Sequence, residues 1–437
     1  MKETLKAGFL VGLVILSFYL SWRLFWPEAR VSPASLSGTP ILFQGSTLQI
    51  PPDLFSPYAA TDWEADKRWT ADDAGVFPEI RTFFRRVLAA VPVQAWREAA
   101  PRSREEGTRS SLDVMWLTPV SLAAVLWEPG ETGCREGEDI LFSRVSLRRE
   151  GGVWVLGLWQ GDKGREVVLE GFPGEPENLM AWLSQQPGEV LREAALPLGW
   201  PETGPLALPA TLPEVAAIPL RREEFPSARS VAEAFFPDMA VVRRIDLGPD
   251  QVLFTDREAT LRLDQNLQYE AVRISFPSDL CLAQAISRVD RFVGGHGGWP
   301  EEPLLLWKFQ QEGGRFHVEW GERVGFLPAV DPRPALGITL DDQGVKEYGR
   351  RLFRPLPLLP GQKGLKVKDP VSILHTWSEE GGEPFPVEAI LLVLRPPGDP
   401  PQPQVLVPYW LFVGAGGPAL WAEAWTGTVV PNPEEGP

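Results

Sequence analysis

Few side chains in this sequence could act as a general acid or base. The three histidines are His296, His317 and His375, and His296 lies in the glycine-rich run Gly294–Gly298. An imidazole on such a loop could serve as a general base, which needs a partner group and a pocket. The same run is typical of the end of a helix, where the imidazole interacts electrostatically with the last carbonyl groups. We favour this second interpretation.

Adjacent carboxylates offer little more chemistry. Asp72–Asp73, Glu105–Glu106 and Glu379–Glu380 could pair as acid and base, although side-by-side charges in an acidic chain usually lie on the solvated surface. The chain contains no Gly-x-Ser-x-Gly, Ser-x-x-Lys, phosphate-loop or His-Glu-x-x-His motif. We therefore expect no catalytic residue, no cofactor and no metal site.

The two cysteines, Cys134 and Cys281, are few for an exported fold held together by disulfides. One long-range bridge is an alternative, but two buried free thiols are the favoured interpretation. A net charge of −16 would repel a polyanion, so nucleic acid is not an expected partner.

An apolar segment from Ala7 to Trp26 has the length that spans a bilayer, roughly 20 helical residues. A cleavable secretory signal is the alternative, but the apolar core of such a signal is normally about 7 to 15 residues long. Lys2 and Lys6 precede the span and favour a cytoplasmic tail of residues 1–6. We expect a single-pass protein of the cell membrane whose body is extracytoplasmic.

Within this span, Gly8 and Gly12 form a Gly-x-x-x-Gly pair, and Ser17 and Ser21 form a second pair of small residues. At about 100° per residue the two pairs lie on opposite faces of a helix. These four residues are the predicted site of interaction with other transmembrane helices.

The pattern of the remaining chain predicts an α+β ectodomain of antiparallel sheets with packed helices. The expected units are a linker at 27–45, an N-terminal domain at 46–200, a proline-rich connector on the surface at 201–227, a central domain at 228–323 and a C-terminal domain at 324–437. Helices are expected at 78–91, 176–186, 278–292 and 370–377. Strands are expected at 112–117, 140–148, 153–160, 165–169, 252–254, 259–263, 267–274, 304–309, 315–320, 337–340, 345–353, 389–394, 405–413 and 420–429.

The sequence pattern of the second half indicates one structural unit that occurs twice. The segment 261–269 resembles the segment 338–348, and both fit hairpins in which Asn266 or Gly344 tolerates a positive φ. We therefore predict a duplication.

From Ala232 onward the sequence resembles the YycH and YycI family, and its three-part layout and length suit YycH better. The residues that carry the resemblance are Phe236-Pro237-Asp238, Val242-Arg243-Arg244-Ile245, Leu253-Phe254-Thr255-Asp256, Leu261-Arg262-Leu263, Gly297-Gly298-Trp299, Gly337-Ile338-Thr339-Leu340 and Tyr348. Phe254 and Arg257-Glu258 depart from the pattern, which indicates a distant member.

The resemblance implies a non-enzymatic regulator of a WalK (YycG) type sensor histidine kinase, with a YycI-type protein as a further partner. Its helix and ectodomain would bias the kinase between signalling states through different contacts with each. An exported module that binds a cell-wall fragment, lipid or small ligand is the alternative, and a wall-active hydrolase is a third class for which no nucleophile is found.

Overall fold

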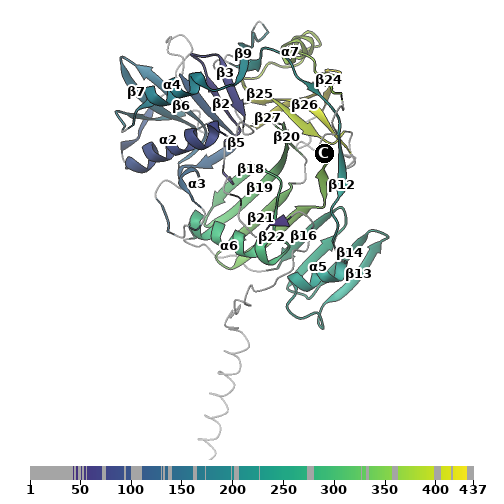
Figure 1. The fold of residues 1–437 in the computed structure, drawn as a ribbon. Helices are drawn as coiled ribbons and strands as arrows, with labels where there is room; N and C mark the ends of the chain where they lie inside the picture. Colours follow the sequence, from purple (N-terminus) through teal and green to yellow (C-terminus); the bar gives the residue numbers. More distant parts are fainter. Residues whose placement is uncertain are drawn as a thin grey trace, which may run out of the picture. The chain divides into compact units, whose positions relative to one another are not determined.

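The structure is a computed structural model, and it describes residues 43–430 with gaps at 44–45, 48–50, 52–53, 56, 71–74, 93–94, 100–110, 129, 131–132, 136–139, 161–164, 173, 198, 201–205, 226, 273–279, 326, 331–333, 357–362, 398–404 and 415–416. The residues from Ile41 onward form one compact unit. Within the described ranges the fold is a mixture of six helices and mostly antiparallel sheets, which confirms the predicted α+β class (Figure 1).

A nine-stranded antiparallel sheet forms most of the first half, in the order β10-β9-β3-β2-β5-β6-β7-β8-β4. Its strands are β2 Ala59–Asp62, β3 Lys67–Thr70, β4 Arg97–Ala99, β5 Leu112–Ser121, β6 Leu141–Glu150, β7 Val153–Gln160, β8 Arg165–Glu170, β9 Glu189–Glu193 and β10 Ala207–Pro209. The antiparallel strands predicted here form a meander, because β5, β6, β7 and β8 pair in chain order. Gly151 and Gly152 make the β6–β7 turn with φ of 54° and 91°, values that favour glycine.

Two helices cover this sheet, α2 Val76–Ala90 and α4 Pro176–Gln185, while the short α3 Leu122–Leu126 follows β5 (Figure 1). Within α2 the apolar residues at helical spacing are buried: Ile80, Phe83, Phe84, Val87 and Leu88. Leu179, Met180 and Leu183 of α4 are buried as well. The helical spacing of these residues therefore identified the faces that pack on the sheet.

A fifteen-stranded sheet forms most of the second half, in the order β13-β14-β15-β16-β22-β21-β19-β20-β25-β26-β12-β23, with β18 paired to β19, β27 to β26 and β28 to β27. Its strands are β12 Ile218–Arg222, β13 Arg243–Gly248, β14 Gln251–Thr255, β15 Ala259–Leu263, β16 Asn266–Ala271, β18 Leu304–Glu312, β19 Arg315–Val324, β20 Leu327–Ala329, β21 Leu336–Asp341, β22 Gly344–Arg351, β23 Phe353–Pro355, β25 Val387–Arg395, β26 Val405–Gly414, β27 Gly417–Glu423 and β28 Val429–Val430. Only the contact of β20 with β25 is parallel among the described pairs.

Three helices accompany this sheet: α5 Ala228–Phe235, α6 Leu282–Gly295 and α7 Pro370–Glu379. Ser227 caps α5 by accepting a hydrogen bond from the Ser230 backbone N–H. Asp369 caps α7 in the same way, with Pro370 in the first turn. Two small antiparallel pairs complete the described strands: β1 Ser46–Thr47 with β17 Trp299–Pro300, and β11 Glu214–Val215 with β24 Leu365–Lys366.

The two hairpins compared in the sequence both form, and they lie side by side because β16 pairs with β22. Gly344 has a φ of 121°, whereas positive φ among the described non-glycine residues occurs at Asp66 and Arg257, not at Asn266. β21 and β22, assigned from sequence to the C-terminal unit, lie in the sheet between β16 and β19 of the central unit. The duplication and the unit boundaries stay predictions.

The proline-rich connector differs from the expectation of a surface segment. It contributes β10, β11 and β12, and β12 pairs with both β26 and β23. Leu208 and Ile218 are fully buried or nearly so, at 0% and 2% exposed. The connector therefore belongs to the core of the C-terminal region.

The cysteine prediction is wrong. Cys134 and Cys281 form a disulfide with a Cα–Cα distance of 5.5 Å, and Cys134 is exposed rather than buried. The bridge joins the chain between β5 and β6 to the residue that caps α6. This bridge was the alternative that the sequence left open. The 147 residues between the two cysteines hide how close they lie in the fold.

Candidate functional site

The residues predicted to bind other transmembrane helices, Gly8, Gly12, Ser17 and Ser21, lie outside the described residues, as does the whole predicted span. Among the helices of the described ranges, none is long and apolar enough to cross a bilayer.

His296 lies at the end of α6, as predicted, and its ring packs between aromatic side chains. Its Nδ1–H donates to the carbonyl oxygen of Phe292 at 2.6 Å, and its ring stacks on that of Phe292 at 3.9 Å between centroids. The Phe235 ring lies 4.6 Å away. Burial lowers the pKa of His296 from 6.5 to about 4. The imidazole is therefore neutral at pH 7, and it caps the helix by a hydrogen bond rather than by its charge.

A hydroxyl, an imidazole and a carboxylate group form a line across β19 and β21. The sequence did not reveal this arrangement. The Nδ1 atom of His317 lies 2.8 Å from Thr339 Oγ1, and its Nε2 lies 2.7 Å from Glu319 Oε1. Serine hydrolases use the same order of groups. Here, however, the Thr339 hydroxyl donates to Glu347 at 2.8 Å, and Thr339 is 2% exposed. Its oxygen is not presented to a substrate, so this line is better described as a structural network.

The adjacent carboxylates do not form an acid–base pair in the described part of the chain. Glu379 and Glu380 lie exposed at the end of α7, whereas Asp72–Asp73 and Glu105–Glu106 fall outside the described residues. No group of three metal-binding side chains is found among the described residues.

Phe43, the first described residue, packs against the buried guanidinium group of Arg350. The Phe43 side chain is fully buried, and the guanidinium carbon of Arg350 lies 4.3 Å from its ring centroid. Arg350 also donates to the Gly298 carbonyl at 2.6 Å. A Cβ atom at Gly297 would come within 2.3 Å of the Phe43 ring. Glycine is therefore required there both by its φ of 118° and by the space that Phe43 occupies.

Arg350 is neutralised by a buried carboxylate. Its Nη2 lies 3.1 Å from Glu223 Oε1, and Arg354 pairs with the same carboxylate. Arg354 also pairs with Glu302 at 3.0 Å. Glu223 follows the connector strand β12, so this network ties the connector to β22 and to the segment around Phe43. Removing one partner of a buried pair leaves an uncompensated charge, at a cost of about 3–5 kcal/mol.

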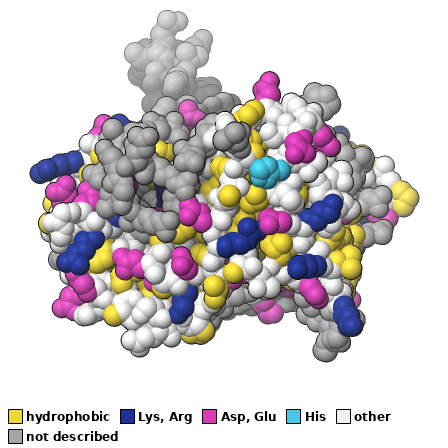
Figure 2. Space-filling model, turned by 90° about the horizontal axis from the view of Figure 1, so that it is seen from above, with side chains coloured by type: hydrophobic (Ala, Val, Ile, Leu, Met, Phe, Trp, Pro, Cys, Tyr) yellow, Lys and Arg dark blue, Asp and Glu magenta, His cyan; other side chains and the backbone are white. Residues whose placement is uncertain are grey.

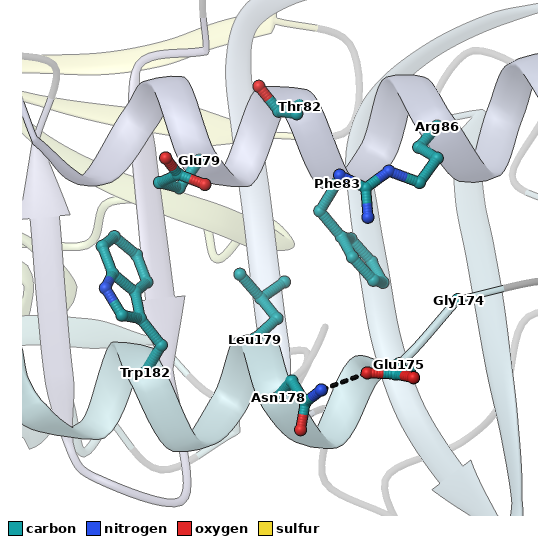
Figure 3. Close-up of a pocket in the computed structure, with 9 residues that line it drawn as sticks. All are labelled: Glu79, Thr82, Phe83, Arg86, Gly174, Glu175, Asn178, Leu179 and Trp182. Atoms are coloured by element: carbon teal, nitrogen blue, oxygen red, sulfur yellow. Dashed lines mark hydrogen bonds between the residues drawn. The ribbon is translucent and has the colours of Figure 1, made fainter.

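An open groove of about 590 Å³ lies between α2 and α4. Figure 3 shows Phe83 pointing from α2 toward α4, and Leu179 and Trp182 pointing from α4 toward α2. Polar side chains form the rim: Glu79, Thr82, Arg86, Glu175 and Asn178. An apolar floor with a mixed-charge rim suits an amphipathic ligand.

Charged side chains on one face of the body are mixed rather than segregated by sign. On the face shown in Figure 2, basic and acidic side chains are interspersed, and no large area carries one sign. That distribution offers no basic stripe of the kind that tracks a polyanion.

Many of the residues that carry the family resemblance come together at one end of the large sheet. Val242 to Ile245, Leu253 to Asp256 and Leu261 to Leu263 lie on or beside the neighbouring strands β13, β14 and β15. The side chains of Phe254 and Leu261 are buried on the same face as α5 residues Val231 and Phe235, within one core. The residues of these motifs therefore have a structural role, because they pack against α5 and hold it on this sheet.

The overall architecture matches a solved structure. The crystal structure of YycH from Bacillus subtilis aligns with a TM-score of 0.54 over 86% of this chain and 98% of that chain, at 12% sequence identity. The described fold is YycH-like.

Other similarities are weaker. An uncharacterized protein from Eubacterium rectale aligns with a TM-score of 0.33 and 9% identity over 55% of this chain and 93% of its own. The C-terminal domain of YpeB from Bacillus megaterium gives 0.29 and 15% over 46% and 93%. No family model matches the sequence, and no curated protein matches it.

Proposed function

We propose that this chain is a membrane-anchored, extracytoplasmic regulator of a sensor histidine kinase of the WalK (YycG) type. The single observation that carries the proposal is the YycH-like fold, which extends over 86% of the chain. The short motifs quoted from the sequence also support it, since they resemble the same family. The candidate groups described above also suit a scaffold better than a catalyst.

The disulfide supports the extracytoplasmic location. Bridges form and persist in oxidising compartments and are rare in the cytosol of most organisms. Cys134 and Cys281 account for all the cysteine in the chain, and both are in the bridge. The apolar segment Ala7–Trp26 would anchor this exported body.

In this proposal the body and the span act on the kinase together. A regulator can shift the kinase only by as much as its affinities for the two signalling states differ. The Phe43 contact with Arg350 offers a physical link, because it fixes the start of the described body to a buried network. A displacement of the segment around Phe43 would then reach β22 and the connector directly.

The transmembrane prediction can be tested by replacing Gly8 and Gly12 together with Leu. Bulky side chains would keep two helix backbones from approaching closely, so co-purification of the full chain with a co-expressed sensor kinase should fall several-fold. The matched control is Phe9→Trp with Leu20→Phe, which adds bulk on the flank between the two small-residue faces and should have little effect. Unchanged association of the glycine variant would remove those residues from the interface.

The groove between α2 and α4 favours one second candidate, an exported module that binds a cell-wall fragment, lipid or small ligand. Its volume of about 590 Å³ falls in the range of small-ligand sites. Binding of such a fragment by the purified protein, abolished by Trp182→Ala and without any effect on kinase association, would support this candidate over the first.

A further inference from the structure

Strand β13 forms the outer edge of the large sheet, and all six of its residues are exposed (Figure 1). It pairs with β14 on one side, and in the described structure its other edge faces no strand. Such an edge presents backbone N–H and C=O groups that can pair with another chain. Soluble proteins usually protect these edges with charges, bulges or covering elements.

This edge carries unusual apolar exposure. Ile245 and Leu247 on β13 are 43% and 51% exposed, and Val241, two residues before the strand, is 61% exposed. These are three of the seven large apolar side chains left exposed among the described residues. Exposed apolar side chains on an unpaired strand are typical of a surface that binds another strand.

The charges on β13 specify which strand fits. Arg244 and Asp246 lie on one face of the strand, and their side chains are 2.8 Å apart. If a second copy of β13 pairs antiparallel about Ile245, each Arg244 faces an Asp246 of the other copy. Alignment about Arg244 or about Asp246 would instead place like charges directly opposite each other, which is destabilising. One register is thus favoured by charge, and it also brings the two Ile245 side chains together.

We propose that β13 is a self-association surface, through which two copies of this chain pair edge to edge about Ile245. The contact is isologous, as expected of a two-fold dimer. Six residues a side bury less than the roughly 1,200 Å² typical of a stable interface, so the pairing is weak in dilute solution. Anchoring in a membrane, which rests on the function proposed above, would raise the effective concentration of the two copies.

The first test is cross-linking of the full chain in bacterial membranes after Ile245→Cys. Directly opposite residues in an antiparallel pair have Cα atoms about 4.5–5.5 Å apart, a distance that a disulfide spans. We expect a reducible band of twice the chain mass. The control is Val153→Cys, which introduces a thiol at a site that is 49% exposed on β7. Equal cross-linking of the two variants, or cross-linking of Ile245→Cys only to a different protein, would overturn the proposal.

The second test separates a second copy from any other partner. With Ile245→Cys present, Arg244→Glu leaves only acidic groups at these two positions, and Asp246→Arg leaves only basic groups. Each variant alone should lose most of its cross-linking, whereas co-expression of differently tagged copies of the two should restore it between unlike copies.

The pair within each strand stays broken in this mixture, so its loss cannot explain the rescue. Failure of the mixture to cross-link, with each variant folded by circular dichroism, would contradict self-pairing. Association with the kinase, measured in the same membranes, does not depend on whether β13 pairs with itself. It therefore tests the proposed function separately.

Discussion

At the scale of single residues, His296 gives the body a dependence on pH. Its pKa is about 4 in the folded chain and about 6.5 when unfolded, because folding buries the imidazole among Phe235, Phe292 and neighbouring rings. Between these two values the unfolded chain binds more protons than the folded chain, so stability falls as the pH drops from about 6.5 toward 4.

Replacing His296 with Phe should therefore reduce the loss of unfolding free energy between pH 7 and pH 4.5 by on the order of 1–3 kcal/mol, as measured by urea unfolding at the two pH values. His375→Gln is the matched control, since His375 is exposed on α7 and the variant leaves His296 in place. A wild-type slope retained in His296→Phe would show that other groups dominate acid stability.

The position of this histidine was predictable, but its protonation was not. Glycines on both sides of His296 indicate a helix end, and α6 does end there. The Phe292 ring that helps to bury the imidazole lies on α6 itself, but the Phe235 ring comes from α5, which is distant in sequence. The Thr339–His317–Glu319 line escaped prediction for a similar reason, since Thr339 reaches His317 only through the pairing of β21 with β19.

At the scale of elements, the attachment of the β1 segment to the body depends on Phe43. Its ring contacts Phe225 edge-on at 6.2 Å between centroids and lies against Arg350, just before β1 pairs with β17. Phe43→Ala would remove this packing and leave Arg350 without its aromatic neighbour, at a cost of about 3–5 kcal/mol.

Hydrogen exchange is the appropriate measurement for this variant. We expect faster exchange in β17 and around Gly298, with unchanged exchange in the distant β6–β7 hairpin as the internal control. A uniform change across both regions would mean that Phe43 supports global stability without a local role.

Elements with a strong local pattern were predicted closely. β7 was expected at 153–160 and β15 at 259–263, and both form with those bounds. β12 was missed, because Pro219 and its neighbours resemble a loop and its partners β23 and β26 are far along the chain. Long-range pairing can override weak local propensity, and no local signal reports it.

At the scale of the whole molecule, one covalent link joins the two halves. Cys134 and Cys281 connect the region between β5 and β6 to α6, and Phe55 adds packing across the same boundary, with Trp127 and Phe309 each 6.1 Å away between ring centroids. From sequence the bridge was only the alternative to two free thiols, and the contacts of Phe55 were not predicted, because cross-domain packing depends on topology rather than on local pattern. The insertion of β21 and β22 between β16 and β19 illustrates the same limit.

The contribution of this link can be predicted from the length of chain that it closes. A loop of 147 residues constrains the unfolded chain by up to about 5 kcal/mol in the chain-entropy view. Replacing both cysteines with Ala should therefore lower the free energy of unfolding by a few kcal/mol at neutral pH, as measured by urea denaturation of the purified protein.

Reduction of the wild type provides a matched comparison. Dithiothreitol should lower the stability of the wild type to about that of the double variant and should leave the double variant unchanged. Because Cys134 is exposed, reductant can reach the bridge without prior unfolding. If reductant has no effect on the wild type, then either the bridge does not form in the folded chain or packing between the halves alone determines stability. Counting free thiols in the unfolded, unreduced protein distinguishes these two cases, since only an unformed bridge would leave both cysteines reactive.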